Sequence, residues 1–423
     1  MWYLFPCNLH RQSSNPEVPV NIHSFPALRP TPARAALIAA PPYDVVSTAE
    51  AASQAKGNPD CFFHVSRPEI DLPAGADPHS AEAYAAARAA LDRLRASGAL
   101  VPDADPALFI YRQVMGDHTQ RGVAACLDTG DYDVLIKTHE KTRPDKEDDR
   151  MRHIAALGAQ TGLVFLLYPD RAEIDRLVAK TEAQPPLYDF TSDDGIRHSV
   201  WKAADSAALA KAFQAVPHCY IADGHHRAAA AVRVARERQA GNPAHTGREE
   251  YNRFLGVLFP ASQLQVLPYN RAVRDLNGLS RDAFLAAVRD RFAITPEANP
   301  RPAEPGLCSL YLDGAWYSLR LVAAPDADAL ASLDVSVLQD RLLAPVLGIT
   351  DPRTSARIEF IGGIRGPDEL ARLVDSGKAA VAFSMHPVTV GQLMAISDAG
   401  QTMPPKSTWF EPKLRSGLLL HTL

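Results

Sequence analysis

A short segment with the sequence DGHHR, residues 223–227, contains residue types that bind anions and transfer protons. It follows the apolar residues YIA and precedes a run of alanines, so we expect a strand, a tight turn and a helix. The first-turn amides of a helix have no partner within the helix, and the helix dipole is positive there. Gly224 would let a phosphate approach the backbone, and Arg227 supplies a fork of donors. We therefore predict an anion or phosphate site formed by Asp223, Gly224, His225, His226 and Arg227.

Two other interpretations of this turn remain open. In the first, Asp223 simply caps the helix and Gly224 makes the turn. Capping leaves the two histidines and the arginine unexplained, because cations in a first helical turn oppose the dipole unless an anion is present. In the second, Asp223, His225, His226 and His218 hold a metal ion. Neighbouring helical side chains point about 100° apart, so His225 and His226 would converge only in an irregular turn.

A run of mixed charges from residue 137 to residue 153 contains the second candidate. Most of these charges are expected on a solvated face or in a loop. His139 and Glu140 differ because they follow the segment VLIK, at the end of a predicted strand, where substrate clefts of α/β proteins open. Glu140 is a candidate general base. Nearby cations could bind or steer phosphate, namely Lys141, Arg143, Lys146 and Arg150.

The segment MPPKSTWFEPK, residues 403–413, is the third candidate. Lys406, Ser407 and Thr408 follow two prolines, which favours a rigid loop that presents a cation and two hydroxyls to an anion. The alternative is a surface turn anchored by Trp409 and Phe410. The two commonest phosphate-loop patterns, Walker A and GxGxxG, are absent from the sequence, as is GxSxG.

Helical and strand patterns alternate along the chain, and the elements they predict must position these residues. Strands are predicted at 108–115, 122–127, 163–168, 254–259, 358–361 and 379–384, with a hairpin over 307–321. Within 36–46 we predict a short strand that enters a Pro-Pro turn. Helices are predicted at 80–96, 227–240, 280–292, 333–347 and 367–376. This order predicts an α+β (mixed α/β) fold. We expect an N-terminal extension at 1–19, a first domain at 20–260 and a second α/β domain at 261–423.

Composition narrows the function classes. The 423 residues are 46% hydrophobic and 22% charged, which is typical of a globular protein. A net charge of -5 argues against a nucleic-acid-binding surface. The five cysteines are too widely spaced for a zinc finger or redox motif and fit a reducing cytoplasm. There is no signal-peptide pattern and no stretch of 18 uncharged apolar residues, so we expect no membrane partner.

Several longer motifs resemble a widespread prokaryotic family catalogued mainly as a domain of unknown function. They are FPALRP, AAPPYDVVS, HVSRPEIDLP, HEKTRPDKEDDR, YIADGHHRAAAA, FLGVLFP and MPPKSTWFEPKLRSGL, and they extend from about residue 20 to the C-terminus. Over a shorter stretch, DGHHR and its helix resemble a motif of the ParB/sulfiredoxin-like superfamily, particularly its free-serine kinases.

The second resemblance implies a ParB/sulfiredoxin-like catalytic domain that uses ATP or ADP with Mg²⁺ to phosphorylate a small hydroxylated metabolite such as serine. It implies phosphate contacts by residues 223–227 and a base at Glu140; we take Glu140 and His226 as the catalytic pair. The same site run in reverse would be a phosphoserine phosphatase. The alternatives are a metal-dependent hydrolase with the DGHH turn as ligands, and a nucleotide-binding regulatory module without turnover.

Overall fold

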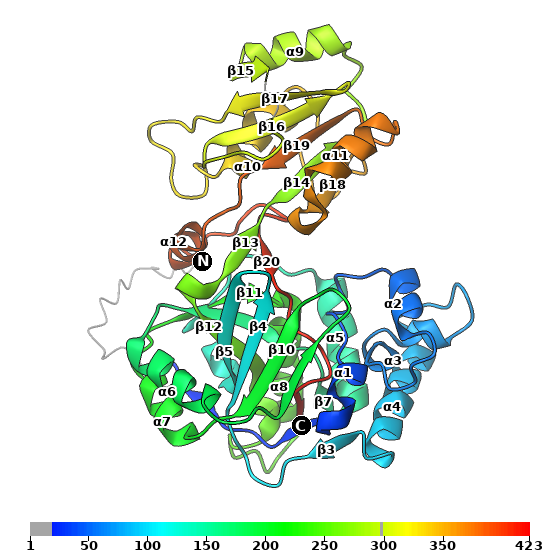
Figure 1. Cartoon of the computed structure of the whole chain (residues 1–423), viewed down its shortest axis with the longest axis vertical. Helices are drawn as coiled ribbons and strands as arrows, with labels where there is room; N and C mark the ends of the chain where they lie inside the picture. The colour runs from blue at the N-terminus through cyan, green and yellow to red at the C-terminus, as the bar shows by residue number, and fades with distance from the viewer. Residues whose placement is uncertain (1–18, 297–298) are drawn as a thin grey trace, which may run out of the picture.

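The computed structural model describes residues 19–296 and 299–423, so the predicted N-terminal extension lies almost entirely outside the described residues. The described chain forms two bodies that are stacked along the long axis (Figure 1). The first body carries a large mixed sheet and a smaller sheet. The second body carries a six-stranded sheet. The mixed α/β fold class predicted from the sequence is therefore confirmed.

The large sheet of the first body has nine strands. They are β1 (Ile22–His23), β4 (Phe109–Met115), β5 (His118–Asp128), β6 (Ile136–Lys137), β8 (Val164–Tyr168), β9 (Tyr188–Thr191), β10 (Arg197–Lys202), β11 (Cys219–Asp223) and β12 (Arg253–Pro260). Their order is β6-β11-β8-β12-β5-β4-β10-β9, with β1 beside β5. Two pairs are parallel, β6 with β11 and β8 with β12, and the other pairs are antiparallel.

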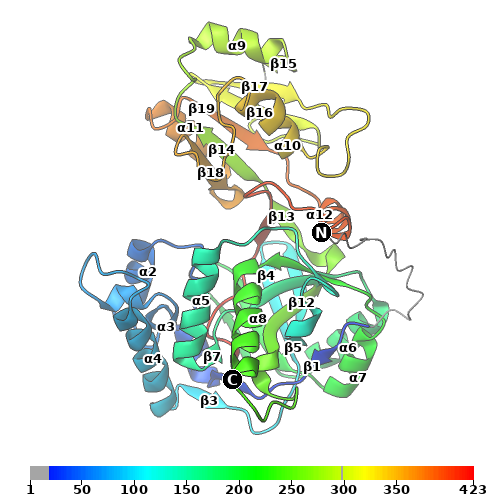
Figure 2. The ribbon, with the colours of Figure 1, turned by 180° about the vertical axis from the view of Figure 1, so that it is seen from behind.

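Eight helices accompany this sheet in the described part of the chain. They are α1 (Ala35–Ile38), α2 (Thr48–Ala55), α3 (Phe63–Ser66), α4 (Ala81–Ala96), α5 (Pro144–Leu157), α6 (Ala172–Glu182), α7 (Ser206–Phe213) and α8 (His225–Ala240). Side chains of α6, α7 and α8 pack into one hydrophobic cluster with alternate residues of β5. The intervening residues of β5 belong to a second cluster that contains Phe410, Leu414 and Leu418 from the end of the chain. Figure 2 shows α5 and α8 side by side on the back of the first body.

The end of the chain returns to the first body. A four-stranded sheet has the order β3 (Leu100–Pro102), β2 (Ala27–Pro30), β21 (Leu420–Thr422) and β7 (Ala159–Gln160). The predicted division at residue 260 does not hold for these last residues, because β21 pairs with β2 and with β7. The limits of the folding units otherwise stay a prediction. Chain order alone gives no sign of such long-range pairing.

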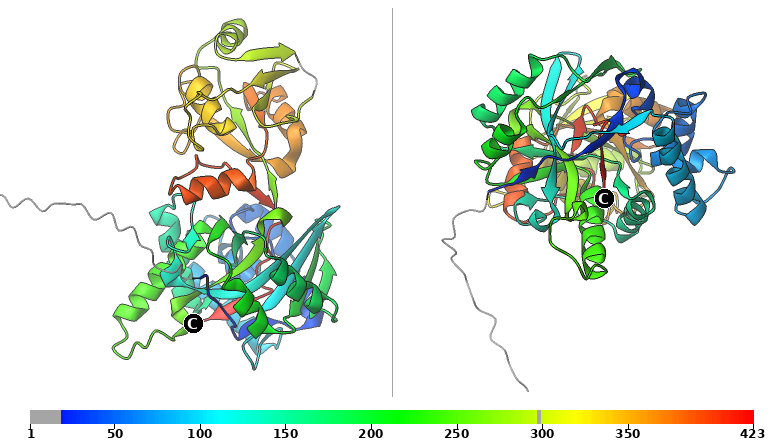
Figure 3. Two further views of the ribbon diagram at one scale, coloured as in Figure 1. Left: turned by 90° about the vertical axis from the view of Figure 1, so that its left-hand side faces the viewer. Right: turned by 90° about the horizontal axis from the view of Figure 1, so that it is seen from below.

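In the sequence, the second body lies between β12 of the first body and the segment that returns to the first body. Its strands are β14 (Tyr269–Val273), β15 (Ala293–Pro296), β16 (Leu307–Leu312), β17 (Ala315–Arg320), β18 (Ile358–Gly362) and β19 (Val381–Met385). Its helices are α9 (Arg281–Arg289), α10 (Asp334–Leu338) and α11 (Gly366–Asp375). The two bodies are joined by the antiparallel pair β13 (Gln265–Leu267) and β20 (Trp409–Glu411). Helix α12 (Val390–Asp398) lies between the bodies (Figure 3).

Most predicted elements are present, and one is wrong. The predicted strand at 36–46 is instead the end of the helical turn α1 followed by a proline-containing loop, although Ala40 makes an isolated bridge to Ser416. The two prolines at 41 and 42 lie in this loop, where the sequence predicts a turn. Most of the charge run forms α5, which begins at Pro144. Among the described residues, no helix is long and apolar enough to cross a membrane.

Candidate active site

The turn between β11 and α8 has the predicted form. Gly224 is the N-cap of α8 and has a left-handed backbone, with φ 96° and ψ 27°. A residue with a Cβ is strained in this region, which accounts for the glycine. No side chain caps α8, and the Asp223 carboxylate pairs with Arg227 instead. The capping interpretation of Asp223 is therefore wrong, and the first-turn amides of α8 have no side-chain acceptor in the described structure.

Arg227 holds this turn from inside the protein. It is 8% exposed, and its guanidinium donates to Asp223 Oδ2 at 2.9 Å and to the Leu163 carbonyl. A Cβ added to Gly162 would lie 2.9 Å from Arg227 Cδ, and one added to Gly224 would lie 3.0 Å from Arg227 Cζ. Two glycines thus make room for this side chain. A contact of Arg227 with phosphate stays a prediction.

A polar pocket at the end of β11 brings together side chains from distant parts of the sequence. Glu140 follows β6 and Asp223 ends β11; because β6 and β11 are parallel neighbours, both carboxylates lie at the same edge of the sheet. The third predicted segment covers this edge. The lining residues are His139, Glu140, Ala222, Asp223, Tyr269, Met403, Pro404, Lys406, Ser407, Thr408 and Lys413.

Glu140 is the one carboxylate of the pocket with substantial solvent access. Its side chain is 46% exposed, and Oε2 lies 3.7 Å from Nδ1 of the buried His225. Desolvation in the pocket raises the pKa of Glu140; Lys406 opposes this rise, and the neighbouring Asp223 adds to it. A carboxylate with a raised pKa is a better proton acceptor than an ordinary surface glutamate.

The three histidines around Glu140 are neutral at physiological pH. Burial lowers the pKa of His139 to about 4 and holds that of His225 well below its ordinary value. The pKa of His226 is also lowered by desolvation, and its Nε2 accepts a hydrogen bond from the Arg143 amide at 3.1 Å. Positive charge for an anion must therefore come from lysine, arginine and the helix dipole.

Lys413 supplies one such charge. Its Nζ lies 3.7 Å from Asp223 Oδ2 and 5.0 Å from the centre of the Trp409 ring. Desolvation opposes ionisation of Asp223, but Lys413 and Arg227 outweigh it and hold the pKa of this carboxylate well below its usual range. Asp223 is therefore ionised and paired with Lys413 and Arg227. Its role is to position these two side chains.

The loop at residues 403–408 closes the pocket from the other side. The Met403 amide donates to the His139 carbonyl at 2.8 Å, and Thr408 Oγ1 lies 3.4 Å from His139 Nε2. Lys406 has a left-handed φ of 53°, and its Nζ lies 5.4 Å from the centre of the Tyr269 ring. The Ser407 hydroxyl donates to the Pro404 carbonyl at 2.7 Å. Lys406 is thus the cation this loop presents, while Ser407 stabilises the loop.

The structure brings some of the predicted residues to the pocket and leaves others elsewhere. Glu140, Asp223, Lys406, Ser407 and Thr408 line it. The remaining residues of the turn lie behind or beside it on α8, and the four cations predicted to steer phosphate do not line it. Two of those cations have acidic partners on α5: Arg143 pairs with Asp145 and Arg150 with Asp149.

Sequence reasoning missed Lys413 and Tyr269 as lining residues. Lys413 was detectable, because it closes the motif that contains Lys406. Tyr269 had no detectable signal, since it lies at the start of the second body and only the fold brings it to this edge.

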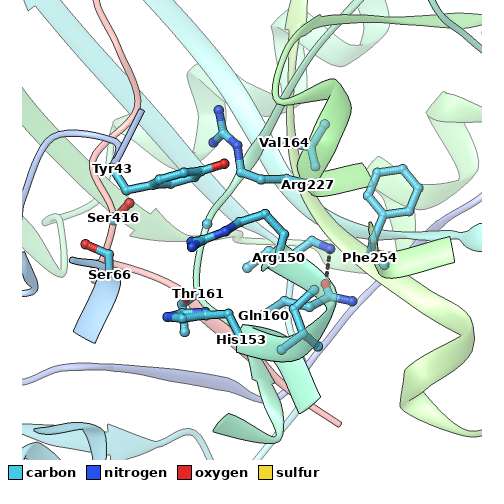
Figure 4. A pocket seen from close by; sticks show the side chains of 14 residues that line it. Tyr43, Ser66, Arg150, His153, Gln160, Thr161, Val164, Arg227, Phe254 and Ser416 are labelled. Carbon is cyan, nitrogen blue, oxygen red and sulfur yellow. Dashed lines mark hydrogen bonds between the residues drawn. The ribbon is translucent and has the colours of Figure 1, made fainter. Parts of the chain in front are cut away.

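A second cavity lies on the other side of Arg227 (Figure 4). The Arg150 guanidinium stacks 4.0 Å from the centre of the Tyr43 ring, and the Tyr43 hydroxyl points toward the Arg227 side chain (Figure 4). Burial raises the pKa of Tyr43 to about 12, so its hydroxyl keeps its proton. The opposite wall is apolar and contains Ile154, Val164 and Phe254. Arg227 therefore lines this cavity and also pairs with Asp223, which lines the polar pocket.

The arrangement does not resemble a metal centre. Across residues 19–296 and 299–423, no three His, Cys, Asp or Glu side chains are placed to hold a metal ion together. His225 points its Nδ1 toward Glu140, whereas His226 accepts from the Arg143 amide, so the two rings do not converge. The hydrolase alternative, in which the DGHH turn supplies the ligands, therefore has no support from this geometry.

Comparison with known proteins identifies a family. The family model described as "Protein of unknown function (DUF1015)" matches residues 22–336. No curated protein matches the chain. Solved structures with some similarity include a free serine kinase in complex with AMP, with 13% identity, a TM-score of 0.34 and coverage of 70% of this chain and 92% of that one. A truncated SbnI from Staphylococcus aureus has 12% identity, a TM-score of 0.38 and coverage of 71% and 87%. A conserved hypothetical protein from Pyrococcus furiosus has 11% identity, a TM-score of 0.34 and coverage of 70% and 95%.

Proposed function

The chain belongs to the DUF1015 family, and because the description of that family assigns no activity, we propose a function from the site itself. We propose that the protein transfers a phosphoryl group between a nucleotide, ATP or ADP, and the hydroxyl of a small metabolite. Serine is the first candidate substrate, from the resemblance of the DGHHR motif to free-serine kinases. The reverse reaction, return of the phosphoryl group from the phosphorylated hydroxyl to the shortened nucleotide, uses the same groups.

One observation carries this proposal. A proton acceptor, two lysines and Asp223, the residue just before the uncapped N-terminus of α8, come from three distant segments and line one pocket. Phosphoryl transfer needs little covalent chemistry from the protein, and most of its catalysis comes from positioning and from positive charge around the phosphate. Lys406 and Lys413 supply that charge, and the amides at the start of α8 add donors.

In the forward direction Glu140 accepts the proton of the substrate hydroxyl. The hydroxyl oxygen forms a bond to the terminal phosphorus of the nucleotide, and the bond from that phosphorus to its bridging oxygen breaks, which leaves the nucleotide one phosphate shorter. Neutral His225, 3.7 Å from Glu140 Oε2, orients the carboxylate without adding charge. Mg²⁺ would be held mainly by phosphates and water, and would neutralise phosphate charge.

The catalytic role of His226 stays a prediction, and its hydrogen bonding limits that role to one ring nitrogen. Because its Nε2 accepts a backbone hydrogen bond, only Nδ1 is left to donate to a phosphate. A regulatory module that binds nucleotide without turnover would keep the lysines and the helix N-terminus, and it would not depend on Glu140.

The test is to measure both binding and turnover for one pair of variants. Wild-type protein should bind ATP or ADP with Mg²⁺ in calorimetry and should form phosphoserine from serine. Glu140→Gln should retain nucleotide affinity and lose turnover by about 100-fold or more, since a general base contributes that much. Glu173→Gln, a surface glutamate paired with Arg176, is the matched control and should leave both unchanged. Binding without turnover in the wild type would favour the regulatory module, and no nucleotide binding would refute the proposal.

A further inference from the structure

A hollow with a cavity volume of about 190 Å³ lies beside the polar pocket, at the junction of the two bodies. The first body, the turn Gly363–Arg365 after β18 and the returning strand β20 with the residues after it all contribute walls. The lining residues are Pro41, Val45, Val46, Asp194, Ile196, Ile364, Arg365, Trp409, Glu411, Lys413 and Arg415.

One part of this hollow is apolar. Ile364 is 53% exposed, although it is a large aliphatic side chain. Single exposed aliphatic residues are common on protein surfaces. Ile364 differs because it lines the same hollow as Val45, Val46, Ile196 and Trp409. A ligand with a flat apolar part would cover these groups together.

The polar groups of the hollow are largely fixed. Glu411 accepts hydrogen bonds from Trp409 Nε1 at 2.7 Å and from the Lys413 amide at 3.1 Å. Arg415 pairs with Asp194. Arg365 interacts with Glu50 and Glu369 through its charge. The hollow thus offers an apolar surface with the Arg365 cation at its edge.

Lys413 lines both the hollow and the polar pocket. The two cavities therefore adjoin at this residue, and a ligand that spans both would place one end against Lys406 and Lys413, where we propose phosphate. Its end in the hollow meets aliphatic and indole side chains. A nucleotide has these two ends in one molecule.

We infer that the hollow binds the base and ribose of the nucleotide, and that Ile364 and Arg365 give the second body a direct part in nucleotide recognition. This inference rests on the proposed function, which places the phosphates in the adjoining pocket. Apart from Tyr269, the first body and its returning segment line the phosphate pocket, whereas the hollow takes Ile364 and Arg365 from the second body.

Calorimetry with two kinds of probe separates the nucleoside contribution from the phosphate contribution. The probes are pyrophosphate and the nucleoside diphosphates ADP, GDP, CDP and UDP, each with Mg²⁺. Wild-type protein should bind at least one diphosphate about tenfold or more tightly than pyrophosphate. Ile364→Asp should weaken that diphosphate about five- to tenfold, because it places a carboxylate against the base, and should change pyrophosphate affinity by less than about twofold. Arg365→Ala should act in the same direction with a smaller effect.

Val322→Asp is the matched control, because Val322 is 58% exposed in the same body and does not line the hollow. It should leave the affinity for both probes unchanged, and a thermal unfolding scan of each variant checks that it folds. Equal affinity of the wild type for pyrophosphate and every diphosphate, or unchanged diphosphate affinity in Ile364→Asp, would overturn the inference and leave the phosphate site intact. Failure of every probe to bind would overturn the proposed function as well.

Discussion

Replacing Arg227 by alanine should destabilise the folded protein, because the side chain joins β11, α8 and the segment before β8. The substitution removes a charged hydrogen bond to Asp223 at 2.9 Å and a second one to the Leu163 carbonyl. Removing one partner of a buried ion pair typically costs about 3 to 5 kcal/mol. Asp223 keeps Lys413 at 3.7 Å, so we expect the lower end, about 3 kcal/mol in the free energy of unfolding.

The assay is urea denaturation of the ligand-free protein, followed by circular dichroism. Arg233→Ala is the matched control, since Arg233 lies on the same helix and pairs with Glu147 at 3.2 Å and Asp148 at 2.7 Å, but its side chain is 35% exposed. Partly exposed ion pairs contribute about 0 to 1 kcal/mol. If both variants lose the same stability, Arg227 does not hold the turn in the way its contacts indicate, and the reasoning fails.

Three further predictions concern stability. Burial lowers the pKa of His153 to about 4 from 6.5, so the stabilising effect of its neutral form should be complete above pH 6.5 and should fall by up to roughly 3 kcal/mol as the pH drops toward 4. In denaturation experiments at several pH values, His153→Gln should flatten this pH dependence. Parallel plots of stability against pH for the wild type and the variant would contradict the prediction. Gly256→Ala should cost about 1 to 3 kcal/mol, because its Cβ would lie 2.3 Å from Leu166 Cδ1, and an unchanged urea midpoint would refute this. His421→Ala should cost about 2 kcal/mol by removing the 2.7 Å contact to Glu250; the control Glu249→Gln, on a surface turn, should cost less.

The sequence predicts local structure well where one segment determines it. The strand, turn and helix around Gly224 needed only a glycine, an apolar run and strong helix formers, and all three are present. The strand at 36–46 was wrong because its apolar residues gave no sign that the helical turn α1 would form there. In that segment, tertiary packing outweighed the local pattern.

Features that depend on long-range pairing could not be predicted in this way. Residues 139–140, 223 and 406–413 were singled out separately, but nothing in their spacing showed that they would meet. The parallel pairing of β6 with β11 brings the first two together, and the contact between the Met403 amide and the His139 carbonyl brings the third. The burial of Arg227 was also undetectable, because a guanidinium in a first helical turn looks exposed until Gly162 and Leu163 are placed beside it.

The position of β21 affects how the protein is made. This strand lies between β2 and β7, and the loop that covers Glu140 also comes from the last part of the chain. As the ribosome synthesises the chain, the smaller sheet of the first body lacks an inner strand until residues 420–422 have been added. The second body, whose strands run from β14 to β19, is complete earlier and can fold while its neighbour waits. A nascent chain therefore cannot acquire a closed pocket before residues 403–413 have been synthesised.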